Sequence, residues 1–263
     1  MPRKPRLQSS TDYYHVMMRG NNKEKIFISS AQKNFFLDCL NQLNNDGLIN
    51  IVAYCIMDNH VHLVVKADIV DLSNYLKKVN TKYAVTFNNL HKRVGHVFQG
   101  RFKSEVICDE SYLTNVIRYV HTNPIRAKVT NNAKDYKWSS YNEFTNGIRI
   151  VSSSLKEFIL SCYGGINNFI EFHKVVDVNE YLDTKEEIDE HRYEIAQEII
   201  SKYFNDNGIN ELSEIKNQSS HLEYIIKYLI FQTRLSNRQL SRLLNISYYT
   251  VSNFRGQLQA SND

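Results

Sequence analysis

Hydrophobic and polar positions follow two periods in the first half of the chain. Alternating, β-rich patterns cover residues 12–19, 49–57, 60–66 and 104–108, and helical patterns cover 29–43, 72–90 and 109–122. Only Asp58 and Asn59 separate the second and third strand patterns, which is typical of a tight hairpin. Asn123 and Pro124 are expected to stop the last helix. This order predicts an α+β fold, a ferredoxin-like split βαβ arrangement with an antiparallel sheet and one appended helix.

Helical patterns dominate the second half. Residues 126–184 predict short helices and loops, and an acidic helix is expected over 185–204. Residues 235–256 then show a cap, a helix, a turn at Asn245, a second cap and a second helix. This is typical of a helix-turn-helix, although a helical hairpin used for dimerisation would share it. We therefore expect an α+β domain over 1–150, followed by an all-α part with a connector over 151–219 and a helix-turn-helix region over 220–263.

Composition narrows the class of protein. The chain is 42% hydrophobic with only 9 glycines and 3 prolines, which excludes disordered, fibrous and collagen-like classes. No stretch approaches the roughly twenty apolar residues of a membrane helix, and the first residues lack the apolar segment of a signal peptide. Four widely separated cysteines suggest neither a disulfide framework nor a thiolate zinc site. We expect a cytoplasmic protein without a membrane partner.

The net charge of +4 conceals two halves of opposite sign. Residues 1–150 carry 21 basic against 12 acidic side chains, whereas residues 151–263 carry 11 against 16. One segment has no acidic residue and seven basic ones, namely Lys77, Lys78, Lys82, Lys92, Arg93, Arg101 and Lys103. The aromatic residues between them are Tyr83, Phe87, Phe98 and Phe102. Such a segment suits a nucleic-acid backbone with bases stacked on the aromatics, and a solvated helix face is the alternative.

The C-terminal region carries a similar signal on a smaller scale. Five basic residues and no acidic one occur between 227 and 255. In a helix-turn-helix the second helix presents its outer face to the base edges and phosphates of duplex DNA. We expect that face to comprise Tyr248, Tyr249, Thr250, Ser252, Asn253 and Arg255.

Two histidines and a tyrosine are the candidates for chemistry. His60 and His62 alternate on one strand, so their imidazoles share a face and can chelate one metal ion. In the last helix of the α+β domain, Tyr119 and Asn123 lie one turn apart on the border of the apolar stripe. Tyr112 shares that edge and is the competing nucleophile. Exposed or satisfied histidines and a packing tyrosine are the ordinary alternatives.

A tyrosine beside a metal held by two imidazoles and one carbonyl oxygen indicates phosphoryl transfer on a nucleic acid. The divalent ion polarises the scissile phosphate, and the phenol attacks in line to leave a covalent phosphotyrosine. Because a free Tyr titrates near a pKa of about 10, activation by the metal is part of the hypothesis.

Four ordered segments resemble a known family. They are YHVMMRGNN at 14–22, MDNHVHLVV at 57–65, GHVFQGRFK at 95–103 and RYVHTNPIRA at 118–127, followed by DYKWSSY at 135–141. Their order and spacing resemble the IS200-like transposases with a single catalytic tyrosine, and most closely the REP-associated branch. The C-terminal pattern resembles the DNA-binding end of bacterial replication initiators and sigma factors.

The resemblance implies an HUH-type single-strand DNA nickase and strand transferase that uses Mg²⁺ or Mn²⁺. By motif match, His60 and His62 would be metal ligands and Tyr119 the nucleophile. Asn123 would be the third ligand, where relatives often carry the longer Gln. Arg19 and Arg126 lie in matching motifs and join the expected DNA contacts. The expected partner is single-stranded or hairpin DNA with flanking duplex, at the nucleoid, and a homodimer is left open.

Two other functions remain alternatives. One is a DNA-binding regulator derived from a transposase, which would not need His60, His62 and Tyr119 together. The other is a metal-dependent phosphodiesterase acting on RNA or a small substrate, which a covalent tyrosine adduct would exclude.

Overall fold

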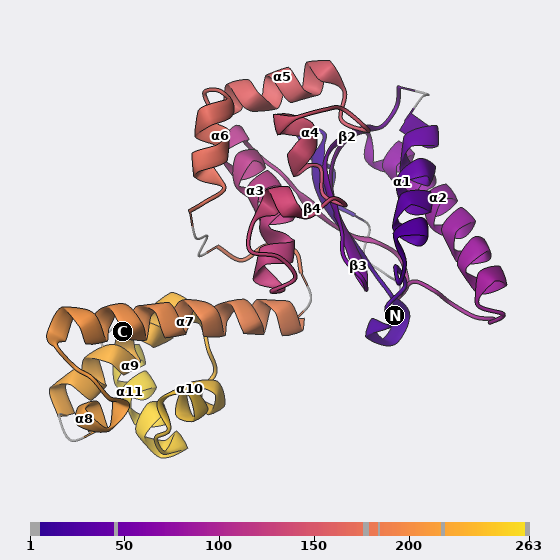
Figure 1. The fold of residues 1–263 in the computed structure, drawn as a ribbon. Helices are drawn as coiled ribbons and strands as arrows, with labels where there is room; N and C mark the ends of the chain where they lie inside the picture. Colours follow the sequence, from indigo (N-terminus) through magenta and orange to yellow (C-terminus); the bar gives the residue numbers. More distant parts are fainter. Residues whose placement is uncertain (1–5, 45–46, 176–178, 184, 217–218, 261–263) are drawn as a thin grey trace. The chain divides into compact units, whose positions relative to one another are not determined.

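The computed structural model describes residues 6–44, 47–175, 179–183, 185–216 and 219–260 (Figure 1). These residues form a β-sheet domain followed by helices. The strands are β1 (Tyr13–Arg19), β2 (Asn50–Ile56), β3 (His60–Lys66) and β4 (Lys103–Val106). The helices associated with them are α1 (Ser30–Asn44), α2 (Ile69–Leu90), α3 (Glu110–Arg126), α4 (Tyr141–Thr145), α5 (Ser153–Cys162) and α6 (Ile166–Phe172), with short 3-10 turns at Asn21–Lys23 and Ala133–Asp135.

The sheet has the strand order β2-β3-β1-β4, and every neighbouring pair is antiparallel. The chain runs β1-α1-β2-β3-α2-β4-α3, so β1 and β3 are the two central strands. Their register places Met17 opposite His62 and Arg19 opposite His60. This confirms the predicted split βαβ fold with one appended helix, and it puts both histidines of β3 on a strand that is hydrogen-bonded on both sides.

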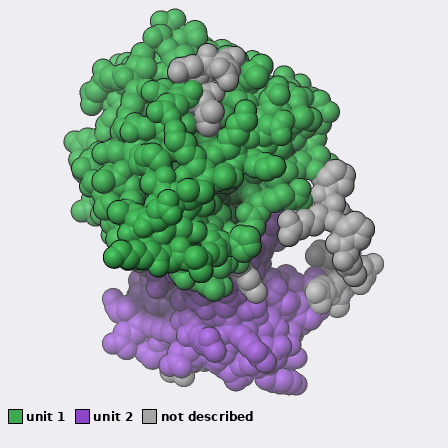
Figure 2. All heavy atoms as spheres, turned by 90° about the vertical axis from the view of Figure 1, so that its right-hand side faces the viewer, with its two compact units in different colours: residues 1–182 green, residues 183–263 purple. Residues whose placement is uncertain are grey.

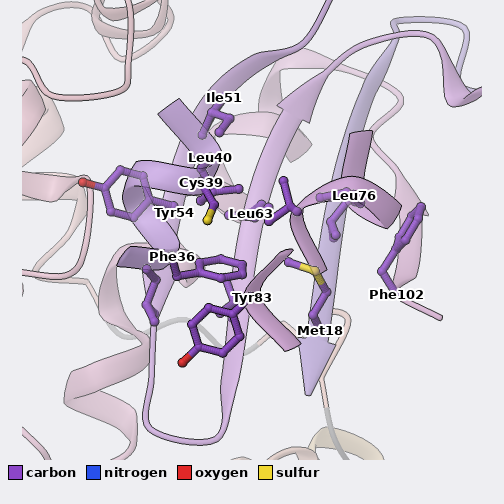
Figure 3. Close-up of a cluster of buried hydrophobic side chains, with 14 of the residues drawn as sticks. Met18, Phe36, Cys39, Leu40, Ile51, Tyr54, Leu63, Leu76, Tyr83 and Phe102 are labelled. Carbon is purple, nitrogen blue, oxygen red and sulfur yellow. The ribbon is translucent and has the colours of Figure 1, made fainter. Parts of the chain in front are cut away.

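The helices α1 and α2 cover one face of the sheet (Figure 1). Alternate residues of each strand point to this face, and the cluster they form with the two helices includes Met18, Leu63, Phe36, Leu76 and Tyr83 (Figure 3). The hydroxyl of the buried Tyr83 is also hydrogen-bonded, because it donates to the carbonyl of Ile26. The core on this side therefore fixes the sheet and leaves the opposite face for the candidate site.

The helix α3 packs on that opposite face, where Val116, Ile117 and Val120 are fully buried. The predicted stop at Pro124 is wrong, because the helix continues to Arg126 with Pro124 inside it. Proline removes one helical N–H, but the next turn still closes: Ala127 N–H donates to the Asn123 carbonyl at 2.9 Å. Asn123 and Pro124 are both buried, so packing against the sheet compensates for the lost bond.

The chain divides into two compact units, residues 1–182 and 183–263 (Figure 2). The second unit is all-α, with α7 (Lys185–Asn207), α8 (Leu212–Lys216), α9 (Ser219–Thr233), α10 (Asn237–Leu244) and α11 (Tyr248–Ala260). Its core joins Ala196 of α7 to Ile226, Leu240 and Val251 of the later helices. The α+β class with an all-α C-terminal part is thus confirmed, and the division at 150 and 219 stays a prediction. Among the described residues, no helix is long and apolar enough to cross a membrane.

The helix pair α10 and α11 has the caps that the sequence predicts. Ser236 and Gln239 form a capping box at the start of α10, and Asn245 adopts a left-handed conformation at its end. Ser247 then caps α11, with its hydroxyl accepting from the Thr250 N–H at 3.1 Å. The two helices share buried Leu240, Leu244 and Val251.

Candidate functional site

The hairpin between β2 and β3 places two imidazoles at the centre of the sheet face covered by α3. His60 is 1% exposed and His62 is fully buried, whereas Val61 between them packs on the other face. The alternation predicted from the sequence is confirmed. Two metal ligands would be expected on a solvent-accessible face, but both imidazoles are buried, because Tyr119 and Asn123 of α3 pack over them.

Backbone and side-chain contacts hold the hairpin turn. The backbone carbonyl of Asp58 accepts from the N–H groups of Ile26 and Phe27, and Gly20 N–H donates to the Asn59 carbonyl at 2.7 Å. The buried Lys33 ammonium donates to the Asp58 carboxylate at 2.8 Å. Gly20 cannot be replaced without a shift, since a Cβ there would collide with the Glu24 carbonyl. The start of β3 is therefore fixed from several directions.

The helix α3 brings Tyr119 and Asn123 to the same histidines. The ring centroid of Tyr119 lies 5.3 Å from that of His62, edge to face, and 5.6 Å from that of His15. The Asn123 Oδ1 lies 3.3 Å from His60 Nε2. The four residues that the sequence selects, from a hairpin and from a helix some sixty residues later, thus meet at one place. Tyr119 is 2% exposed and Asn123 5% exposed.

The donor atoms fit a divalent cation. His60 Nδ1 lies 2.7 Å from Asn59 Oδ1, the shorter of the imidazole's two contacts with amide oxygens, and in the tautomer with the hydrogen on Nδ1 it donates to that oxygen. In the neutral imidazole Nε2 then carries a lone pair, and it faces the lone pairs of Asn123 Oδ1. Two acceptors 3.3 Å apart repel each other unless a cation lies between them, and neighbouring ligands of an octahedral ion with bonds near 2.1 Å are about 3 Å apart. Ligand nitrogens of His60 and His62 lie within 4.8 Å of each other.

Burial keeps the neighbouring imidazoles neutral. Desolvation, followed by the nearby His60, His15 and Arg126, lowers the pKa of His62 well below its usual range. Desolvation likewise lowers the pKa of His15 to about 3. Metal ligation needs the neutral imidazole, so the fold supplies the required protonation state at neutral pH.

Tyr119 has aromatic and cationic neighbours on its ring. The guanidinium of Arg126, one of the expected DNA contacts, lies 4.7 Å from the ring centroid, and the ring of Tyr181 lies 4.6 Å away. A cation at this distance favours the developing phenolate. Tyr181 covers the tyrosine in this conformation.

The competing tyrosine, Tyr112, lies nearby in a different environment. Its ring stacks on that of Tyr181 at 6.1 Å. Burial first, and then a hydrogen bond to the Glu105 carboxylate, raise its pKa. A half-buried hydroxyl that donates to a carboxylate is a poorer nucleophile than the hydroxyl of a tyrosine whose ring has a guanidinium over it.

The basic segment of residues 77–103 lies on α2, the loop after it and the first residue of β4. Lys77, Lys78, Lys82, Lys92, Arg101 and Lys103 are exposed, and the half-buried Arg93 pairs with Glu24 at 2.7 Å. Its aromatics point inward: Tyr83, Phe87, Phe98 and Phe102 are all buried in the core. The expected stacking of bases on these four rings is therefore wrong, while the lysines are available to phosphates. Arg19, at the end of β1 opposite His60, is half-buried.

The expected outer face of α11 is mixed. Tyr248 and Tyr249 are 53% and 74% exposed, and Asn253 is exposed. Ser252 is half-buried, and the hydroxyl of Thr250 bonds the capping Ser247. The guanidinium of Arg255 forms hydrogen bonds within the second unit, where it donates to the Leu235 carbonyl and to Asn237 Oδ1.

Among the described residues of the first unit, sequence reasoning missed His15, Asn59 and Tyr181 as neighbours of the site. His15 and Asn59 stand inside the quoted motifs, and alternation along β1 could have placed His15 on the histidine face. Tyr181 has no local signal, because its contact with Tyr119 spans more than sixty residues of chain.

Part of the chain is similar to known proteins. Residues 8–123 match the family described as Transposase IS200 like, and no curated protein matches. A solved structure of a REP-associated tyrosine transposase bound to a REP hairpin is 15% identical, with a TM-score of 0.47, over 58% of this chain and 92% of that one. A protein described as a transposase of Deinococcus radiodurans R1 is 12% identical, with a TM-score of 0.32, over 46% and 95%. The matched residues 8–123 contain both histidines, Tyr119 and Asn123, and this part of the chain is similar to the IS200-like transposase family.

Proposed function

We propose that the protein nicks single-stranded DNA and transfers the strand through a covalent 5′-phosphotyrosine on Tyr119. The observation that carries this proposal is the meeting of His60, His62, Tyr119 and Asn123 on one sheet face, with Tyr119 5.3 Å from the His62 ring. The similarity of residues 8–123 to a transposase family supports a reaction on DNA.

Each residue has a role in this reaction. His60, His62 and Asn123 would hold Mg²⁺ or Mn²⁺, which neutralises charge on the phosphate oxygens when bound. The Tyr119 oxygen forms a bond to phosphorus, and the bond to the 3′ oxygen of the departing strand breaks. The phenolic proton leaves Tyr119 and a proton is taken up by the 3′ oxygen, so the products are a phosphodiester to Tyr119 and a free 3′-hydroxyl. Arg126 stabilises the phenolate while it forms.

The reaction is reversible because the phosphotyrosine conserves the energy of the original bond. A second 3′-hydroxyl can attack it and release Tyr119, which is strand transfer without ATP. The polarity, with the 5′ phosphate on the enzyme, is the one that the family resemblance implies. Reaction also requires that the ring of Tyr181 moves off Tyr119 so that the phosphate can approach.

A pool of single-stranded and hairpin oligonucleotides tests the proposal. The protein is incubated with the pool and Mn²⁺, adducts that resist denaturation are isolated, and the attached DNA and peptide are sequenced. We expect attachment at Tyr119 and dependence on the divalent ion. Cleavage in excess chelator would show that the metal is not needed, and metal-dependent cleavage without an adduct would support hydrolysis by a water molecule in place of Tyr119.

Two tyrosine variants make the test specific. Tyr119→Phe removes only the hydroxyl and should abolish the adduct while the fold and DNA binding remain. Tyr112→Phe should keep the adduct, because the Tyr112 hydroxyl is occupied by Glu105. An adduct on Tyr112, or cutting by Tyr119→Phe, would overturn the mechanism. If wild-type protein binds the pool without cutting, the alternative of a DNA-binding regulator is favoured.

The second unit is proposed to bind the duplex that flanks the cut strand. The capped pair α10 and α11, with Tyr248 and Tyr249 exposed on α11, supports this assignment. Electrophoretic binding to hairpins with long and short stems measures it, since only the long stem offers the duplex contacts.

A further inference from the structure

The two candidate metal ligands are each held at Nδ1 by another side chain. The Nδ1 of His60 bonds Asn59 Oδ1 at 2.7 Å, and the Nδ1 of His62 bonds His15 Nε2 at 3.0 Å. A histidine that binds a metal through Nε2 needs its hydrogen on Nδ1, and a partner at Nδ1 fixes both the tautomer and the ring orientation. The same relation therefore occurs twice in this site, with a different partner each time.

His15 has no other evident purpose in the fold. It is fully buried on the sheet face under α3, and its ring lies 5.2 Å from that of His62 and 5.6 Å from that of Tyr119. Its neighbours Tyr14 and Val16 point to the opposite face, into the apolar core. Burial of an imidazole is unfavourable unless its nitrogens are used, and an apolar residue would pack this position at lower cost.

The strand β4 supplies the other side of His15. If His15 Nε2 accepts the hydrogen of His62 Nδ1, the neutral His15 carries its own hydrogen on Nδ1. That Nδ1 is buried without a hydrogen-bond partner among the described residues. Directly opposite on β4 is Glu105, whose Oε2 is also buried and also lacks a partner in the described part of the chain. Residues opposite each other in an antiparallel ladder share a face, so the Glu105 carboxylate is the acceptor that we assign to this hydrogen, although no hydrogen bond joins the two atoms in the described structure.

We propose that His15 and Asn59 are positioning residues that hold His62 and His60 with Nε2 directed to the metal, and that Glu105 orients His15. This rests on the proposed function, because it assigns a purpose to the pair of histidines as ligands. None of the three residues needs to touch the DNA or the metal.

The first test is to determine which ring nitrogen of His62 carries the hydrogen, and this experiment needs no metal. In the wild-type chain labelled with ¹⁵N-histidine, long-range ¹H–¹⁵N correlation should show His62 with its hydrogen on Nδ1. His15→Leu removes the acceptor, so we expect the Nε2–H tautomer, which free imidazole prefers. His15→Gln keeps an oxygen within reach and should retain Nδ1–H. Because the tautomer is determined without metal or DNA, the result is valid even if the protein does not nick DNA.

The second test is the affinity for Mn²⁺, measured by electron paramagnetic resonance. His15→Leu and Asn59→Ala should each weaken it by about 10- to 100-fold, the range found for residues that orient metal-bound histidines. His15→Gln and Asn59→Asp should retain most of the wild-type affinity for Mn²⁺. Glu105→Gln should lower the affinity less than His15→Leu does. His173→Leu is the matched control: His173 is also buried and also bonds a second histidine, His121, at 3.0 Å, but outside the site. It should leave Mn²⁺ affinity unchanged.

Several results would overturn the inference. They are a wild-type His62 with Nε2–H, wild-type Mn²⁺ affinity in His15→Leu and Asn59→Ala, and an equal loss in His173→Leu, which would indicate general loosening of the fold. If instead the tautomers behave as expected but wild-type protein forms no adduct at Tyr119, the positioning assignment holds and the proposed reaction fails.

Discussion

Asn123 is the ligand candidate whose contribution is expected to be the smallest. Its oxygen is neutral, and a water molecule can take the place of one neutral oxygen at a divalent ion. Asn123→Ala should therefore weaken Mn²⁺ binding and adduct formation by about tenfold or less, whereas His60→Ala should remove both. Calorimetric titration with Mn²⁺ and a gel assay of the adduct give the two numbers. Equal losses in the two variants would show that the amide has a role beyond ligation.

The buried histidines of the first unit make its stability depend on pH. Burial lowers the pKa of His173 to about 4, despite the opposing bond from its Nδ1 to the Phe169 carbonyl. An unfolded histidine titrates near 6.5, so below that pH the unfolded chain takes up a proton that the folded chain does not. The contribution of His173 to the free energy of unfolding is therefore fully present above pH 6.5. It decreases by up to about 1.4 kcal/mol per pH unit as the pH falls towards 4.

Urea unfolding at pH 7 and pH 5 checks this dependence. His173→Gln cannot be protonated in this range, so the difference between the two pH values should be smaller in the variant than in the wild type. An unchanged difference would mean that His173 does not contribute to the acid sensitivity.

Residue types and their spacing predict which side chains meet, but not how deeply they are buried. Alternation gave His60 and His62 a common face, and the helical period gave Tyr119 and Asn123 a common edge. Their burial depends on how α3 lies across the sheet and on Tyr181, which are long-range properties. His15 was missed for the same reason: its partner is on another strand, and only the register of β1 against β3 brings them together.

At the scale of elements, the strands and helices of the first unit agree with the sequence within a few residues, and α3 is the exception. The rule that a helix stops before proline weighs one lost hydrogen bond and a steric clash. Here the turn at Asn123 is buried against the sheet, and packing outweighs that local cost. The consequence is functional, because a helical Asn123 is what places its oxygen one turn from Tyr119.

The segment after α6 covers the candidate nucleophile through Tyr181, which leads to a prediction about rate. Tyr181→Ala removes the ring that lies 4.6 Å from Tyr119, so the covered state loses apolar contacts and is less populated. We expect the single-turnover rate of adduct formation to rise several-fold. Tyr181→Phe keeps the ring and should have the wild-type rate. A slower Tyr181→Ala would instead indicate that Tyr181 holds Tyr119 in its reactive position.

Within the second unit, two variants can distinguish a residue that stabilises the fold from one that is proposed to bind duplex DNA. Ser236→Ala breaks the capping box of α10 and should reduce stability by about 1 kcal/mol. Tyr249→Ala changes a side chain that is 74% exposed, so it should leave thermal unfolding unchanged and weaken binding to a long hairpin stem. Melting curves and gel shifts of both variants decide this. Tyr249→Ala with unaltered duplex binding would remove α11 as the reading helix.

For the whole molecule, the sequence predicts a change of character after the sheet domain but not where the compact units separate. The charge change near 150 and the apparent start of the helix-turn-helix near 220 are compositional signals. The units of the structure divide at 182, because α4, α5 and α6 share a core with α3, and α7 shares a core with α9, α10 and α11. Core membership depends on contacts between distant residues, which composition does not record.

This boundary decides how the two proposed activities should be separated. A truncation at 219 would leave α7 and α8 without the helices that cover Ala196 and Ile215, so truncation at 182 is the sound design. Residues 1–182 retain His60, His62, Asn123, Tyr119 and Tyr181. We expect them to form the adduct with a short single strand at a rate within a few-fold of the full chain, and to bind a hairpin with a long stem at least tenfold more weakly. The reason is that contacts to the flanking duplex add affinity but do not build the site. Equal affinity of the two proteins for the long stem would show that the second unit does not read duplex DNA, and loss of the adduct in residues 1–182 would show that it takes part in the chemistry.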